Sequence, residues 1–215
     1  RETYERFFRA GAHRYLLRIE TSSPGLFARI HPPQQRLESR IQCLRELKAA
    51  GFQIGTGVMI GLPGQSIEDL AADIRFFKDM DIDMIGMGPY IVHAQTPMAV
   101  SQEDYLLPLQ PFEMALRMIA VTRLTLKDVN IAATTALQAL SPDGREQGLQ
   151  HGANVLMPQL TPLEHRKDYL LYEGKPCIDE DANQCHGCLE RRLAAIGRPI
   201  AYDQWGDSPH ALNRK

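Results

Sequence analysis

The sequence has little that would commit it to a special environment. Its 24 lysine and arginine residues are balanced by 26 acidic residues, for a formal net charge of -2, so it lacks the positive charge that nucleic acids or anionic lipids attract. No apolar run approaches the roughly 20 residues of a membrane span, and the first residues form no hydrophobic signal segment. We therefore expect a cytoplasmic protein whose partners are small molecules or other proteins.

Cysteine is also scarce. The four cysteines are too few and too clustered for a disulfide framework. Cys177, Cys185 and Cys188 form a C-x7-C-x2-C group, which predicts metal ligation, by an iron–sulfur cluster with an open iron site or by zinc. Zinc would need a fourth ligand from His165, His186 or His210. The alternative is a reduced trio that binds nothing.

Five short apolar runs alternate with amphipathic stretches, which is typical of consecutive β/α units around a parallel sheet. Several runs are almost continuously apolar, as expected for strands that are covered on both faces. The predicted strands are Arg14–Glu20, Gln53–Ile60, Asp83–Tyr90, Asn130–Thr134 and Ala153–Met157.

Helical signals lie between these runs. Arg36–Ala50 places its aliphatic residues on one side, as an amphipathic helix does. Ser66 followed by Asp69 resembles a capping box at the start of a second helix. Pro111 suits the first turn of a third helix, and Gly144–Gln150 predicts a shorter one.

The predicted fold class is α/β, a partial (β/α)8 TIM-type barrel that contains about the last five β/α units. Eight strands close such a barrel in about 250 residues, and Arg1 falls inside an apparent helix, so we expect an N-terminally truncated chain. Residues 1–157 are predicted to be the C-terminal portion of the barrel. Residues 158–215 are predicted to be an irregular tail that covers it and carries the cysteine group.

The first predicted strand carries two charges. The active site of a β/α barrel lies at the carboxyl ends of its strands, and alternation puts Arg18 and Glu20 on one face, directed into the barrel. They could form a plain internal ion pair. Alternatively, they could bind an amino acid headgroup, with Glu20 accepting from an ammonium group and an arginine such as Arg40 holding the carboxylate.

Glycines and threonines mark the other strand ends. The segment GVMIGLPGQ, which begins at Gly57, lets backbone approach a ligand closely or simply forms a tight turn. It is neither GxGxxG nor a P-loop, which disfavours phosphate binding. Gly86 and Gly88 would leave space inside the barrel. Thr134 and Thr135 place two hydroxyls at a strand end, where bonding to backbone is the alternative role.

Several segments, taken in order, resemble one family. They are RYLLRIETSSPGLFARIHP, GVMIGLPGQSIEDL, DMIGMGPYIVHAQTPMA, AATTA, NVLMPQLTP and CHGC. Together they closely resemble the radical S-adenosylmethionine (SAM) maturases of FeFe-hydrogenase, the HydE family, which are relatives of biotin synthase and methylornithine synthase. The resemblance covers essentially the whole chain.

This resemblance implies a (β/α)8 barrel that holds SAM and a 4Fe–4S cluster, the source of a 5′-deoxyadenosyl radical. It implies that Glu20 binds the methionyl ammonium group and Arg40 the carboxylate, while Arg18, Thr134 and Thr135 line the substrate cavity. The implied substrate is organometallic, a cysteine-bound iron carbonyl cyanide precursor of the hydrogenase H-cluster. Sister hydrogenase maturases are the implied protein partners.

The resemblance also extends to the tail. Tyr169 and Tyr172 fall near the segment that closes the cavity, and the spacing of the three tail cysteines is one that some family members use for an auxiliary iron–sulfur cluster. One feature departs from the family, because no CxxxCxxC motif occurs in the 215 residues. We therefore expect this chain alone to be inactive, with the ligands of the radical-generating cluster missing.

Two alternative functions stay open. A methylornithine synthase or a biotin synthase-like radical SAM enzyme would share the fold, although biotin synthase typically has an Asn/Asp-rich end to the strand that here carries Arg18 and Glu20. A non-catalytic barrel remnant belongs to a different class. It is disfavoured because exposed sheet edges would need a covering partner. Metal binding by the tail alone is a third possibility.

Overall fold

The computed structural model describes residues 1–100, 105–169, 172, 174–179 and 181–214. Within them, four parallel strands form one sheet in sequence order. The strands are β1 (Arg14–Leu16), β2 (Gln53–Ile60), β3 (Met84–Pro89) and β4 (Asn130–Ala133). Strand order that follows chain order, with a helical crossover at each step, is the pattern of a β/α barrel.

Helices follow the strands in the expected order. They are α1 (Glu2–Arg9), α2 (Pro24–Ile30), α3 (Leu37–Ala49), α4 (Ile67–Asp79), α5 (Pro111–Thr125), α6 (Thr135–Leu140), α7 (Gly144–Gln150), α8 (Ala182–Ala195) and α9 (Pro209–Asn213), with 3-10 turns at Pro97–Val100 and Leu163–Tyr169. The capping box between Ser66 and Asp69 is present at the start of α4. Pro111 is the first residue of α5.

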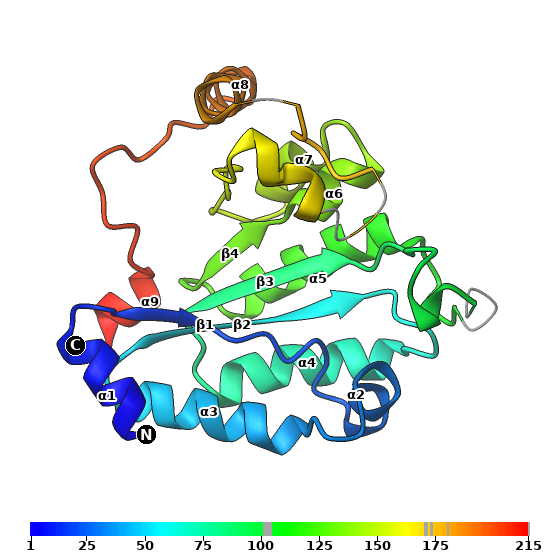
Figure 1. The fold of residues 1–215 in the computed structure, drawn as a ribbon, viewed down its shortest axis with the longest axis vertical. Helices are drawn as coiled ribbons and strands as arrows, with labels where there is room; N and C mark the ends of the chain where they lie inside the picture. The colour runs from blue at the N-terminus through cyan, green and yellow to red at the C-terminus, as the bar shows by residue number, and fades with distance from the viewer. Residues whose placement is uncertain (101–104, 170–171, 173, 180, 215) are drawn as a thin grey trace.

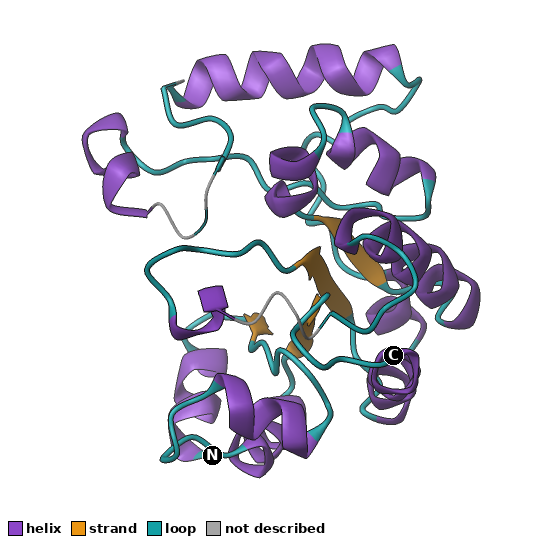
Figure 2. Ribbon diagram, turned by 90° about the vertical axis from the view of Figure 1, so that its right-hand side faces the viewer, coloured by secondary structure: helices purple, strands orange, loops and turns teal. Residues whose placement is uncertain are grey.

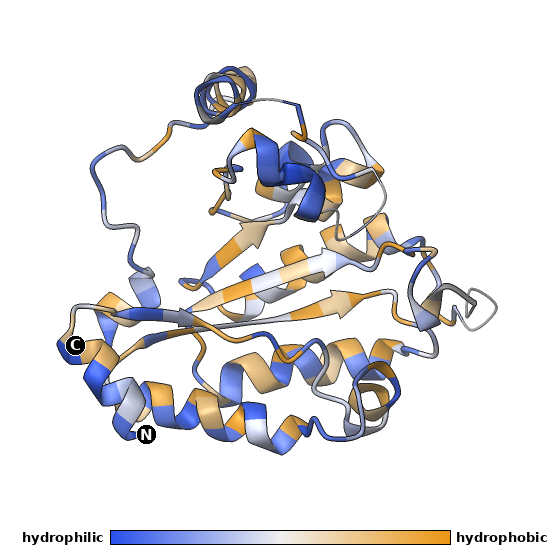
Figure 3. Cartoon of the chain, in the orientation of Figure 1, coloured by the Kyte–Doolittle hydropathy of each residue, from blue (hydrophilic) through white to orange (hydrophobic). Residues whose placement is uncertain are grey.

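The core lies between the sheet and the helices that cover one of its faces. Ile54, Ile60 and Ile85 on the strands are fully buried, as are Leu44 on α3 and Phe77 on α4. Figure 1 shows both α3 and α4 on that side of the sheet. In Figure 3 both helices are banded with hydrophobic and hydrophilic residues, as expected for helices with one buried side.

The first predicted strand is shorter than expected. Regular pairing ends at Leu16 and resumes only as a single bridge between Glu20 and Val58. The cause is a bulge, because the N–H groups of both Ile19 and Glu20 donate to the carbonyl oxygen of Gly57.

The predicted strand Ala153–Met157 is likewise reduced to one bridge, between Val155 and Ala132. Here a side chain takes the place of a backbone acceptor in the hydrogen-bond ladder, because the N–H of Ile131 donates to Asn154 Oδ1 at 2.8 Å. Asn154 Nδ2 then donates to Asn130 Oδ1 at 2.9 Å. The strand is therefore in the predicted place next to β4 without forming a regular fifth member of the sheet.

The tail is more regular than predicted. Helix α8 has 14 residues and begins with a capping box between Asp181 and Gln184, a sequence signal that the expectation of an irregular tail overlooked. In Figures 1 and 2 this helix lies at the top, beyond α7, to which it is joined by the ion pair between Arg192 and Glu146. The chain then descends to α9, which packs at the amino ends of the strands.

Candidate functional site

Arg18 and Glu20 lie on the face of the sheet opposite the helix-covered core. Arg18 Nε donates to Glu20 Oε1 at 2.9 Å, and Nη2 donates to Oε2 at 3.0 Å. The guanidinium also donates to the carbonyl oxygens of Val58 (2.9 Å) and Gly86 (3.1 Å). The two side chains therefore contact each other, and the internal ion pair, one of the two predicted alternatives, is formed.

Two glycines make room for this arginine. A Cβ built on Gly57 would lie 2.6 Å from Arg18 Nη1, and one built on Gly86 would lie 3.0 Å from the same atom. The space at these glycines, which was predicted to admit a ligand, is therefore occupied by the Arg18 side chain. We name Gly57, Gly86 and the Arg18–Glu20 pair above them the strand-end cluster.

Glu20 keeps capacity to bind a ligand. A carboxylate offers about four acceptor positions, and Arg18 does not exhaust them, while 18% of the Glu20 side chain is exposed. The Glu20 backbone is unusual, with φ of 64°, a left-handed conformation that costs a non-glycine residue about 1–2 kcal/mol. Such conformations gather at ligand sites, where the surrounding structure holds them.

Arg40 reaches the same strand end from α3. Its Nη1 donates to the carbonyl oxygen of Arg18 at 2.7 Å, and its Nη2 donates to Gln35 Oε1 at 2.7 Å. The guanidinium carbon lies 5.3 Å from the centre of the Phe27 ring. Because a guanidinium has five N–H donors, Arg40 retains donors for a carboxylate. The donor set therefore fits the zwitterionic end of an amino acid.

Thr134 and Thr135 occupy the end of β4 with different surroundings. Thr134 Oγ1 is buried and has no hydrogen-bond partner in the described residues, and a Cβ built on Gly88 would lie 2.9 Å from it. Thr135 Oγ1 is 2.7 Å from the hydroxyl of Tyr172, and burial raises the pKa of Tyr172. The structure thus brings Tyr172 of the tail to a predicted substrate residue. The side chain of Tyr169 lies outside the described residues.

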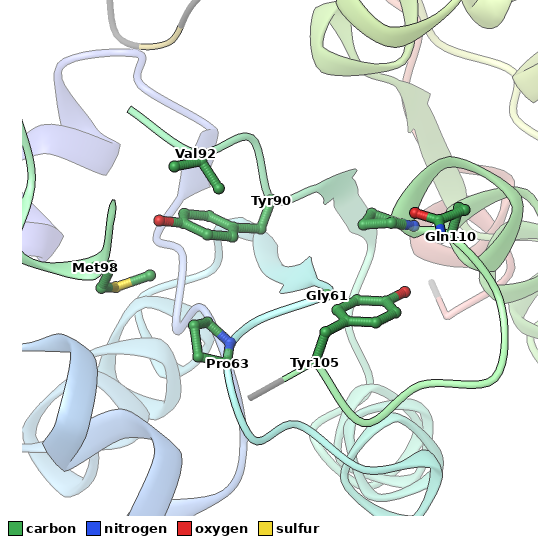
Figure 4. A pocket seen from close by; sticks show the side chains of 8 residues that line it. Gly61, Pro63, Tyr90, Val92, Met98, Tyr105 and Gln110 are labelled. Carbon is green, nitrogen blue, oxygen red and sulfur yellow. The ribbon is translucent and has the colours of Figure 1, made fainter. Parts of the chain in front are cut away.

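A pocket of about 380 Å³ opens beyond the carboxyl ends of β2 and β3. Figure 4 shows the rings of Tyr90 and Tyr105 within it, together with Met98 and Val92. Among the described residues, the buried hydroxyl of Tyr90 has no hydrogen-bond partner. Sequence reasoning missed this pocket because its walls come from three separate segments, the ends of two strands and the start of α5.

The three tail cysteines are not assembled into a ligand set in the structure. Cys185 is buried on α8, Cys188 is half-buried one turn later, and Cys177 lies in the preceding loop with φ of 62°. Among the described residues no three His, Cys, Asp or Glu side chains come together to hold a metal. Cys188 and Cys177 both lie within electrostatic range of Arg192. Metal ligation by this group remains a prediction.

Residues 1–77 match the family profile described as the radical SAM superfamily. The chain is also 44% identical over 206 residues to the [FeFe] hydrogenase maturase subunit HydE of Thermotoga maritima. The chain is therefore similar to radical SAM proteins over its first 77 residues and to this maturase over 96% of its length. The resemblance to the HydE maturases that the sequence segments indicated is confirmed.

Other relatives agree with this placement. A biotin synthase of Gloeothece citriformis is 30% identical over 118 residues, which cover 55% of this chain and 31% of that protein. The crystal structure of methylornithine synthase (PylB) superposes with a TM-score of 0.73 over 93% of this chain, at 23% identity. That likeness confirms the fold class, a partial β/α barrel.

The chain spans only part of these radical SAM relatives. The alignment with the Thermotoga maritima maturase covers 96% of this chain and 57% of that protein, and the superposition covers 56% of the methylornithine synthase chain. No helix in the described part of this chain is long and apolar enough to cross a membrane.

One buried carboxylate near the site was not singled out from the sequence. Asp73 is fully buried on α4, in line with Leu70 and Phe77 on the buried side of that helix. The sequence did contain a signal for Asp73, because a carboxylate stands there at a position of the helix where the pattern calls for an apolar residue.

Proposed function

We propose that this chain is the SAM-binding and substrate-binding part of a radical SAM enzyme that acts in assembly of the FeFe-hydrogenase H-cluster. The observation that carries the proposal is the position of Arg40 beside the strand-end cluster, where Glu20 offers acceptor groups and Arg40 offers donor groups to one amino acid headgroup. The 44% identity to the Thermotoga maritima maturase supports the choice among radical SAM activities.

In this proposal Glu20 accepts hydrogen bonds from the methionyl ammonium group of SAM, and Arg40 donates to its carboxylate. Each charge-assisted bond contributes about 1.5–3 kcal/mol. The apolar pocket at Tyr90 lies at the same end of the sheet and has the size and aromatic lining to take the nucleoside part. A 4Fe–4S cluster bound elsewhere in the protein would supply the electron that cleaves SAM to methionine and a 5′-deoxyadenosyl radical.

The substrate would lie deeper over the sheet. Arg18, whose charge is paired with Glu20, lies there, and the hydroxyls of Thr134, Thr135 and Tyr172 present further polar contacts. This set suits an anionic, cyanide-bearing iron species held on a cysteine. The sister hydrogenase maturases are the proposed partners that deliver and receive it.

The test uses the complete gene product that contains this chain, with its cluster reconstituted under anaerobic conditions. Calorimetric titration with SAM should give a Kd about 10–100-fold higher for Glu20→Gln than for the wild type, because one charge-assisted contact is lost. Glu38→Gln, an exposed carboxylate on α3, is the control and should bind SAM normally. Equal affinities for Glu20→Gln and the wild type would rule out the proposed role of Glu20.

Product analysis separates the related activities. The proposal expects 5′-deoxyadenosine together with activation of an apo FeFe-hydrogenase in the presence of the sister maturases. Formation of methylornithine or biotin instead would move the function to the corresponding relative. Absence of 5′-deoxyadenosine under all these conditions would favour a non-catalytic barrel.

A further inference from the structure

The loop that follows Glu20 is fastened to the opposite face of the sheet by a buried carboxylate. Asp73 Oδ1 accepts a hydrogen bond from the N–H of Ser22 at 2.6 Å. Asp73 has no exposed surface. Within the part of the chain that the structure describes, its second oxygen and the hydroxyl of Ser22 are buried without a hydrogen-bond partner. A carboxylate in this environment is costly, so a purely structural optimum would place an apolar side chain there.

The fastened residue lies two positions after the strained one. Glu20 is held on its strand side by β2, since its N–H donates to Gly57 and its carbonyl oxygen accepts from Met59, each at 2.9 Å. On its other side the chain runs through Thr21 to Ser22, whose N–H would have no acceptor without Asp73. Asp73 therefore closes the set of hydrogen bonds that keeps Glu20 in its left-handed conformation.

We propose that Asp73 is a positioning residue for Glu20, and that it sets the direction of the ligand-binding carboxylate from the core side of the sheet through the backbone of Ser22. This inference rests on the proposed function, in which Glu20 binds the ammonium group of SAM. It assigns Asp73 no contact with the cofactor.

The protonation state of Asp73 agrees with this role. Burial raises the pKa of Asp73 to about 7, against the lowering effect of its contact with Ser22. Either form of the carboxyl group keeps an oxygen that accepts from Ser22. An asparagine also keeps that acceptor, whereas a leucine of similar size removes it and suits the apolar stripe formed with Leu70 and Phe77.

The experiment compares Asp73→Leu with Asp73→Asn in the complete, reconstituted gene product. Asp73→Leu should fold with a thermal midpoint at or above that of the wild type and should raise both the Kd and the KM for SAM about tenfold or more. At saturating SAM its rate of 5′-deoxyadenosine formation should return to at least half that of the wild type. Asp73→Asn should stay within about twofold of the wild type in all three constants.

Asp79→Leu serves as the matched control, because Asp79 is an exposed carboxylate at the end of the same helix. It should leave SAM binding unchanged. A folded Asp73→Leu protein with wild-type affinity would overturn the inference, and so would equal losses in Asp73→Leu and Asp73→Asn.

A second readout needs no ligand. A crystal structure of Asp73→Leu should show Glu20 with a negative φ and its carboxylate turned away from Arg18, whereas Asp73→Asn should keep φ near 64°. If the wild type fails to bind SAM, the proposed function fails, and these two structures still decide whether Asp73 positions Glu20. An unchanged Glu20 in the leucine variant would overturn the inference.

Discussion

Two charged clusters lie at opposite ends of the sheet, and they are built differently. At the carboxyl ends, Arg18 pairs with a carboxylate two residues away and otherwise binds only carbonyl oxygens. At the amino ends, Asp81 is bound by Lys48, His210 and Arg214, which come from distant parts of the chain. The first cluster leaves hydrogen-bonding capacity for a ligand, while the second uses its charges to fasten the C-terminal segment.

The electrostatics show the same contrast. At the amino ends, hydrogen bonds from Lys48, His210 and Arg214 outweigh the effect of burial and hold the pKa of Asp81 well below its usual range. Near the carboxyl ends, Asp73 is hydrogen-bonded to the uncharged Ser22, and burial raises its pKa. The charged form of Asp81, which fastens the C-terminal segment, is therefore stabilised, whereas the charged form of Asp73, near the candidate site, is not.

The largest expected effect on stability concerns Asp73. Because its folded pKa of about 7 lies above the unfolded value of 3.8, its stabilising contribution is complete below pH 4 and is lost as the pH rises towards 7. Asp73→Asn should therefore gain stability relative to the wild type between pH 5 and pH 8, by at most about 4 kcal/mol. Urea unfolding at the two pH values measures the change. A difference that does not vary with pH would contradict a raised pKa.

A smaller effect is expected from filling the space under Arg18. Gly57→Ala would bring a Cβ within 2.6 Å of Arg18 Nη1 and also against the carbonyl oxygen of Gly86, so it should destabilise the protein by about 2–3 kcal/mol. Gly25→Ala on α2, where a Cβ meets nothing within 4 Å, is the control and should be neutral or slightly stabilising. If the two variants had the same urea midpoint, Arg18 would not occupy the space next to Gly57.

The smallest effect is expected at the amino-end cluster. Burial alone would lower the pKa of His210, but hydrogen bonds with Asp81 and Asp128 outweigh it and raise the pKa. The stabilising contribution of His210 is therefore present at acidic pH and is lost as the pH rises through that raised pKa. His210→Gln should cost about 1 kcal/mol at pH 6 and less at pH 9, as measured by urea unfolding. The exposed His151→Gln variant is the control, and an equal cost at both pH values would exclude titration of His210.

Much of the fold could be predicted because its signals are local. The range of β2 was predicted correctly, and the capping box at Ser66 and the proline at position 111 marked the starts of α4 and α5. These features depend on residues within one turn or one strand. Predictions failed where a side chain or a bulge interrupted the ladder, as at Glu20 and Asn154, because the partner that competes for the hydrogen bond comes from another strand.

By itself, the sequence determined the order of the β/α units, the closeness of Arg18 and Glu20, and the resemblance to the radical SAM superfamily, because strand patterns, helix caps and ordered segments depend on neighbouring residues. Only the tertiary structure decided that Gly57 and Gly86 accommodate Arg18, that Tyr172 meets Thr135, and that Asp73 reaches Ser22. Each of these contacts joins residues at least 37 positions apart. Packing across the sheet, rather than any local preference, brings them together.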